Sequence, residues 1–99
     1  MSKLTFAILG MGNRGTVYAK TICKFPERAC VTAIADTRRV RIDAANKYLK
    51  LNEDRIFASA DEMLASPKLA DMMVIATQDA QHRDHAVRAL EKGYASLQY

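Results

Sequence analysis

Three of the chain's four glycines fall within six residues, in the stretch Gly10-Met11-Gly12-Asn13-Arg14-Gly15. The spacing G-x-G-x-x-G is typical of a strand-to-helix loop that binds a pyrophosphate. The first glycine permits a tight turn, the second lets a phosphate approach the main chain, and the third lets the helix pack closely on the strand. The helix N-terminus then presents free N–H groups and a partial positive charge to the anion. A glycine-rich turn without a ligand is the alternative, and the clustering argues against it.

An acid at the end of the next apolar run supports this interpretation. Asp36 follows Gly15 by 21 residues, where a carboxylate can accept hydrogen bonds from the ribose hydroxyls of adenosine. The same carboxylate would repel a 2′-phosphate, which favours NAD as the cofactor. NADP is not excluded, because Arg38 or Arg39 could pair with that phosphate, although an exposed ion pair contributes only about 0 to 1 kcal/mol. With Thr37 between them, Asp36 and Arg38 form the second part of the predicted cofactor site.

A third group of polar residues follows the apolar run that ends at Ala76. By position, Ala76, Thr77, Gln78 and His82 would lie at the carboxyl edge of a strand, where ligands bind in open α/β sheets. Other roles are open from the residues alone. Thr77 or Asp79 could simply cap a helix, and a single histidine on a first helical turn is more often a surface or packing residue.

The elements that must position these three loops alternate along the chain. Apolar runs predict strands at 4–9, 29–35, 55–57 and 72–76, and helical periodicity predicts helices at 13–25, 40–51, 61–65 and from 80 to a stop at Gly93. This alternation predicts an α/β fold, a doubly wound parallel sheet of the Rossmann type. Residues 94–99 lie where a fifth strand belongs, but they are less apolar than a central strand. Two apolar stripes are expected to face the sheet: Tyr18, Ile22 and Phe25 on the first helix, and Val40, Ala44, Tyr48 and Leu51 on the second.

Composition excludes several other classes of protein. The 99 residues allow one domain, and a net charge of +4 without a basic run longer than Arg38-Arg39 argues against a nucleic-acid surface. No apolar run approaches the roughly 18 residues of a membrane span, and no signal peptide precedes the first strand, so a cytoplasmic protein is expected. Cys23 and Cys30 fit no metal-ligand spacing; no metal site is predicted, and both are expected to be packed.

Four segments resemble the Gfo/Idh/MocA family of oxidoreductases, which includes glucose–fructose oxidoreductase and inositol dehydrogenase. They span nearly the whole chain: Ala7–Gly15, Ala33–Asp36, Val74–His82 and His85–Gly93. The family usually has Pro and Asn where this chain has Gln78 and Asp79, a variation compatible with membership.

The resemblance implies the nicotinamide-dinucleotide-binding domain of an NAD(P)-dependent dehydrogenase or reductase acting on a sugar, cyclitol or related polyol. It also implies that the loop from Thr77 to His82 lines the pocket near the nicotinamide ribose. Family members continue into Glu-Lys-Pro, whose lysine assists hydride transfer, and then into a second α/β domain that carries the substrate site and most oligomer contacts. This chain reads Gly93-Tyr-Ala-Ser-Leu-Gln-Tyr99 instead.

Residues 1–99 are accordingly expected to be a single truncated domain that is inactive alone, with no catalytic residue assigned. A fragment and an altered C-terminus fit the sequence equally, and a homo-oligomer is compatible with it.

Three alternatives remain open from the sequence. A non-catalytic NAD-sensing or scaffold module would carry the same loop and acid. A methyltransferase also places a glycine-rich loop and an acid after its first two strands, but Gly15 and the loop from Thr77 to His82 fit a dinucleotide better. The isolated domain could also misfold or self-associate through an uncovered sheet edge.

Overall fold

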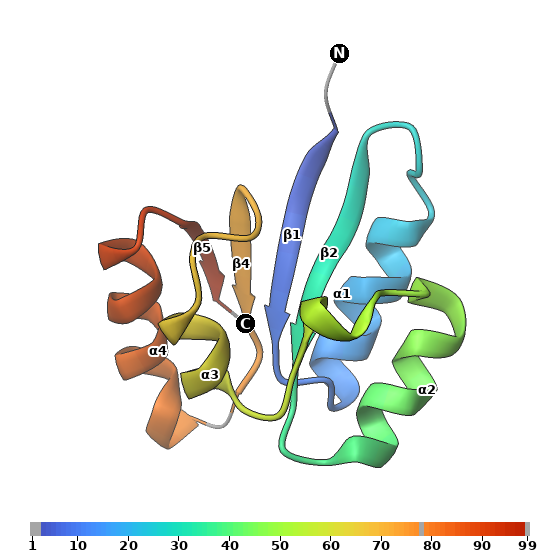
Figure 1. The fold of residues 1–99 in the computed structure, drawn as a ribbon. Coiled ribbons are helices and arrows are strands. Elements are labelled where there is room, and N and C mark those ends of the chain that lie inside the picture. Colours follow the sequence, from blue (N-terminus) through green and yellow to red (C-terminus); the bar gives the residue numbers. More distant parts are fainter. Residues whose placement is uncertain (1–2, 78, 99) are drawn as a thin grey trace.

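The computed structural model describes residues 3–77 and 79–98, which form one five-stranded parallel sheet with helices on both faces (Figure 1). Strands and helices alternate: β1 (Leu4–Leu9), α1 (Asn13–Cys23), β2 (Ala29–Ala35), α2 (Arg39–Leu49), the short 3-10 helix η1 (Glu53–Arg55), β3 (Ile56–Phe57), α3 (Ala60–Ala65), β4 (Met72–Ile75), α4 (Asp79–Glu91) and β5 (Ala95–Gln98). None of the helices in these two ranges is long and apolar enough to cross a membrane.

The strand order β3-β2-β1-β4-β5 makes β1 the centre of the sheet. From β1 the chain first builds outward through β2 to β3, and it then returns to place β4 on the other side of β1. Helices α1 and α2 consequently cover one face, and α3 and α4 cover the opposite face (Figure 1). The predicted doubly wound Rossmann fold is confirmed. Residues 95–98 do form a fifth strand, paired in parallel with β4.

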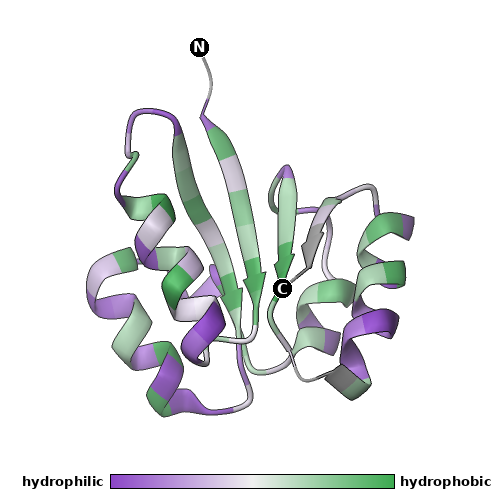
Figure 2. Cartoon of the chain, turned by 180° about the vertical axis from the view of Figure 1, so that it is seen from behind, coloured by the Kyte–Doolittle hydropathy of each residue, from purple (hydrophilic) through white to green (hydrophobic). Residues whose placement is uncertain are grey.

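The central strands are buried on both faces because alternate side chains point to opposite helix layers. Ala7 and Leu9 contribute to the core beneath α3 and α4, whereas Ile8 contributes to the core beneath α1 and α2. In Figure 2 the central strands are coloured mostly hydrophobic, whereas the helices carry both hydrophobic and hydrophilic residues. Burial on both faces explains why these runs are continuously apolar rather than alternating.

Three expectations about packing are wrong. Phe25 is 55% exposed, because α1 ends at Cys23 and the last predicted stripe position falls in a turn. Val40 is 72% exposed and Ala44 is exposed as well, because α2 turns Ile42 and Ala45 toward the sheet instead. Cys23 is exposed on the last turn of α1. The predicted helix stop at Gly93 is confirmed: its φ is +94°, and the N–H of Tyr94 donates to the carbonyl of Ala89.

Candidate functional site

The glycine loop joins β1 to α1 and is shaped by close contacts between main-chain segments. Gly10 has a φ of +92°, and a Cβ at this position would lie 2.8 Å from the carbonyl oxygen of Ala76. A Cβ at Gly15 would overlap the carbonyl oxygen of Gly10. The first glycine is therefore required for a tight turn against the end of β4, and the third for close packing of α1 on β1.

Gly12 has no such internal requirement in the part of the chain described. A Cβ there would have Arg41 Nη1, 3.5 Å away, as its nearest neighbour, which is an ordinary contact. Its φ of −72° is available to any residue. Gly12 is also the N-cap of α1, and no side-chain hydrogen bond caps the helix there. Its main chain and the helix N-terminus thus remain accessible, as a pyrophosphate site requires.

Asp36 connects the glycine loop to the loop after β2. Its side chain is buried, and Oδ2 accepts a 2.7 Å hydrogen bond from the main-chain N–H of Met11. Oδ1 accepts a 2.8 Å bond from the N–H of Arg38, and Arg41 Nη1 lies 3.6 Å from Oδ2. Bonds of an N–H to a charged acceptor are stronger than neutral ones, so this carboxylate holds both loops in place.

A cleft of about 330 Å³ lies at the carboxyl ends of β1, β2 and β4. This edge is where the strand order reverses around β1, the position at which open α/β sheets bind ligands. Six of the predicted site residues line the cleft: Gly10, Gly12, Asp36, Thr37, Ala76 and Thr77. The three predicted loops therefore meet at one site.

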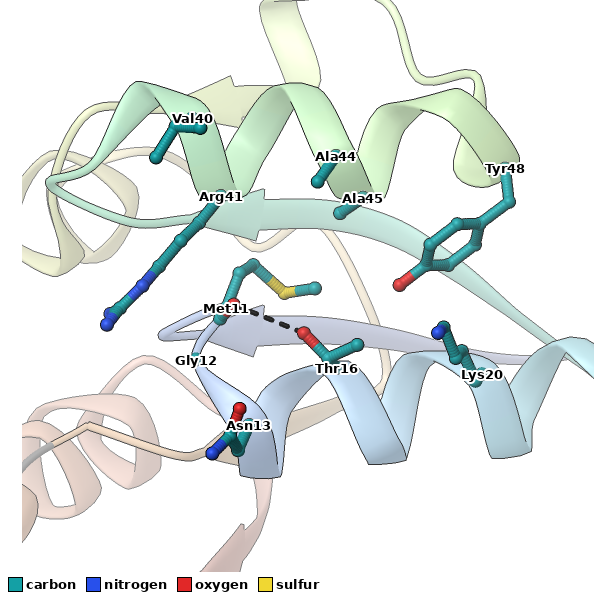
Figure 3. A pocket seen from close by; sticks show the side chains of 10 residues that line it. All are labelled: Met11, Gly12, Asn13, Thr16, Lys20, Val40, Arg41, Ala44, Ala45 and Tyr48. Atoms are coloured by element: carbon teal, nitrogen blue, oxygen red, sulfur yellow. Dashed lines mark hydrogen bonds between the residues drawn. The ribbon is translucent and has the colours of Figure 1, made fainter.

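Other predicted residues lie outside that lining. Met11 and Asn13 line a neighbouring groove between α1 and α2 (Figure 3). Gly15 lies on the buried side of α1, against the end of β1, while Arg14 and Arg38 are exposed at the surface. Gln78 falls outside the described residues.

His82 is held by the end of β4. Its Nε2 lies 2.6 Å from the carbonyl oxygen of Ile75, and since a carbonyl can only accept, Nε2–H is the donor. The bond ties the first turn of α4 to the strand that precedes it. The ring is not among the groups that line the cleft.

His85 does line the cleft, and the sequence analysis missed it. Its side chain is buried, and Nδ1 lies 2.9 Å from Thr77 Oγ1. Burial lowers the pKa of the His85 imidazole, favouring the neutral ring. One signal was available: His85 follows His82 by three residues, so both rings project from adjacent turns of one helix face.

The loop after β3 supplies a further wall that the sequence analysis also missed. Ser59, Ala60 and Asp61 line the cleft. Ser59 Oγ caps α3 by accepting from the N–H of Glu62, and Asp61 pairs with Arg88 of α4 at 2.6 Å, which lowers the Asp61 pKa. The signal lay in topology, because the carboxyl end of β3 shares this edge of the sheet.

Comparisons with known proteins agree with this geometry. The family model described as "Oxidoreductase family, NAD-binding Rossmann fold" (GFO_IDH_MocA) matches residues 4–98. The fold superposes on the WlbA dehydrogenase from Bordetella pertussis, solved with NADH and UDP-GlcNAcA, with a TM-score of 0.85 and 26% identity over 99% of this chain. It also superposes on a myo-inositol dehydrogenase from Corynebacterium glutamicum, with a TM-score of 0.83 and 28% identity over 98% of this chain.

A third similar structure is scyllo-inositol dehydrogenase from Lactobacillus casei with NAD(H) and scyllo-inositol, with a TM-score of 0.84 and 23% identity over 98% of this chain. The chain spans 28% of the length of each of these three proteins. A search of curated proteins finds no match.

Proposed function

Because the chain belongs to the oxidoreductase family with an NAD-binding Rossmann fold, we propose that its cleft holds the dinucleotide in a dehydrogenase or reductase of sugars, cyclitols or related polyols. One observation carries the proposal. The accessible main chain of Gly12 and the buried carboxylate of Asp36 lie side by side at the edge where the strand order reverses. The first suits a pyrophosphate and the second suits ribose hydroxyls.

Each loop has a separate task in this proposal. Gly12 and the first turn of α1 bind the pyrophosphate through main-chain N–H groups. Asp36 accepts hydrogen bonds from the adenosine ribose, aided by Thr37. Ala76 and Thr77 flank the nicotinamide ribose, a proposal supported by the resemblance in the loop from Thr77 to His82, and His82 and His85 orient that loop from α4. The cofactor supplies hydride chemistry, while the domain supplies orientation.

The substrate class is inferred from similar proteins. The Bordetella dehydrogenase was solved with a nucleotide sugar acid, and the Corynebacterium protein is an inositol dehydrogenase. Residues 94–99 do not include the lysine that the resemblance assigns to hydride transfer. We therefore expect the 99-residue chain to bind NAD without turning over a polyol.

Calorimetric titration of the chain tests the cofactor assignment. NAD should bind saturably with a stoichiometry of about one, and S-adenosylmethionine should not bind, since the third glycine and the Thr77 loop suit a dinucleotide. Binding of S-adenosylmethionine in place of NAD would reverse the assignment. A parallel assay of NADH formation with myo-inositol should show no turnover by this chain.

A further inference from the structure

His85 is a buried titratable group in the wall of the cofactor cleft. It lies on the second turn of α4, is 6% exposed, and lines the cleft together with Thr77. Its Nδ1 lies 2.9 Å from Thr77 Oγ1. A hydroxyl both donates and accepts, so Thr77 is a partner for the neutral ring and for the protonated ring alike. Protonation of His85 therefore changes the charge of the cleft without breaking this hydrogen bond.

The charges around His85 come from α3 and α4, which lie on the same face of the sheet (Figure 1). Asp61 of α3 and Asp84 of α4 favour the protonated ring, whereas Arg88 and His82 of α4 oppose it. Arg88 pairs with both acids, at 2.6 and 3.4 Å, which offsets their effect. The strands packed against α4, β4 and β5, contain no titratable residue.

Burial has the largest influence on this ring and lowers the pKa of His85 below its usual 6.5. The ring is consequently neutral in the free protein at neutral pH, and it gains its proton as the solution becomes acidic.

The proposed orientation of the cofactor directs the nicotinamide toward His85. Asp36, the proposed ribose ligand, follows β2, and Gly12, at the proposed pyrophosphate site, follows β1. Strand β4 pairs with β1 on the side opposite to β2. A dinucleotide with its adenosine at Asp36 and its pyrophosphate at Gly12 therefore extends toward the end of β4, where Thr77 and His85 line the cleft.

The two redox states of the cofactor differ by one unit of charge at this end. The nicotinamide ring carries a positive charge in NAD and none in NADH, whereas both forms carry the same pyrophosphate. Attraction between a protonated His85 and the pyrophosphate is therefore common to both forms. Repulsion between two cations affects only the oxidised form, and it is strongest where water is excluded.

We propose that His85 is a specificity-determining residue for the redox state of the cofactor: its protonated ring disfavours NAD relative to NADH. The inference rests on the proposed cofactor function, because it concerns the same cleft. Since coupling between two binding events is reciprocal, NAD must also disfavour the proton on His85, and by the same factor.

Titrations of NAD and of fresh NADH at several pH values test the proposal in the unmodified chain, His85→Gln and His82→Gln. In the unmodified chain the ratio of NADH affinity to NAD affinity should rise by about threefold to tenfold between about pH 7.5 and about pH 5.5. His85→Gln should have a ratio independent of pH, because glutamine does not titrate. His82→Gln is the matched control on the same helix and should retain the rise. Unfolding midpoints verify that each variant is folded.

An NMR titration of the unmodified chain gives a second readout that needs no variant. The ring protons of His85 report its pKa in the two complexes. The pKa of His85 should be lower with NAD bound than with NADH bound by about 0.5 to 1 pH unit, which is the same threefold to tenfold factor.

Several results would overturn this role of His85. They are an affinity ratio that does not change with pH, a rise that persists in His85→Gln, or equal pKa values of His85 in the two complexes. A rise that is lost in His82→Gln but retained in His85→Gln would assign the effect to His82. Failure to bind either cofactor would instead contradict the proposed function, so the two failures are distinguishable.

Discussion

The N–H of Met11 donates a 2.7 Å hydrogen bond to Oδ2 of Asp36, so the residue expected to bind the ribose also fixes the loop expected to bind the pyrophosphate. The two residues lie 25 positions apart in the chain and come from the ends of neighbouring strands. Stability and cofactor affinity should consequently change together when this carboxylate is altered.

Asp36→Asn should lower the free energy of unfolding by about 1 to 3 kcal/mol, because an amide can accept from only one of the two N–H groups and turns its own N–H₂ toward the other. NAD affinity should fall by about tenfold or more through loss of the charged acceptor. Urea unfolding and calorimetry measure the two effects. Asp43→Asn, at an exposed partner of Arg39, is the matched control and should change stability by less than about 1 kcal/mol.

Substitutions at Gly15 and Gly12 should distinguish a glycine needed for packing from a glycine needed for the approach of the ligand. Gly15→Ala places a Cβ on the carbonyl of Gly10 and should destabilise the fold by about 1 to 3 kcal/mol or more. Gly12→Ala meets nothing closer than 3.5 Å and should change stability by less than about 1 kcal/mol, while markedly weakening NAD binding. Thermal unfolding with and without NAD measures both. An equally unstable Gly12→Ala would show that this glycine serves the fold rather than the ligand.

His85 should make stability depend on pH. Burial lowers its pKa below the usual 6.5, so the unfolded chain binds the proton more readily than the folded chain. The free energy of unfolding should be highest above pH 6.5, decline as the pH falls below that value, and stop declining for this group below its folded pKa. The pKa values of the Asp61 and Asp71 carboxyls are lowered from 3.8. These two groups should therefore cause a separate loss of folding stability, which begins only as the pH falls below 3.8.

The measurement is urea unfolding of the unmodified chain and His85→Gln between about pH 7.5 and about pH 5. Glutamine retains a hydrogen-bonding group near Thr77 without titrating. The variant should therefore lack the decline, and identical pH profiles would show that another group is responsible.

His82 should affect cofactor binding by holding α4 against the end of β4 rather than by touching the cofactor. His82→Ala removes the bond to the Ile75 carbonyl and should destabilise the fold by about 1 to 3 kcal/mol. NAD affinity should fall by less than about fivefold, because the ring does not line the cleft. A large loss of affinity with unchanged stability would instead indicate direct contact with the cofactor.

Periodicity and glycine spacing were sufficient to predict the strands, the helices and the three loops that meet at the cleft. Both depend on local chemistry: a strand buried on two faces must be continuously apolar, and a strained turn needs glycine. The sequence did not determine which side of each helix faces the sheet. Val40 and Ile42 are both apolar, and only contact with the sheet determines that Ile42 faces inward.

The missed site residues share one physical cause. Asp61, His85 and Arg41 reach the site through the packing of α3, α4 and α2 around the sheet edge. The spacing from His82 was the signal for His85 and the sheet topology was the signal for Asp61, but the burial of His85 and the approach of Arg41 to Asp36 exist only after folding. Arg38 was predicted as a site residue because it is close to Asp36 in the sequence. Arg41, which lies about one helical turn further along, is the arginine that lines the cleft.

The most direct test of the central claim is an NMR titration of the ¹⁵N-labelled chain with NAD. Saturable shifts should be largest for the amides of Met11, Gly12, Asn13 and Arg38, and small for the opposite edge of the sheet near Asp71. The Met11 amide should respond strongly, since it donates to the carboxylate that we propose binds the ribose. Absence of saturable binding, or shifts centred away from the glycine loop and Asp36, would contradict the assignment of this cleft as the NAD site.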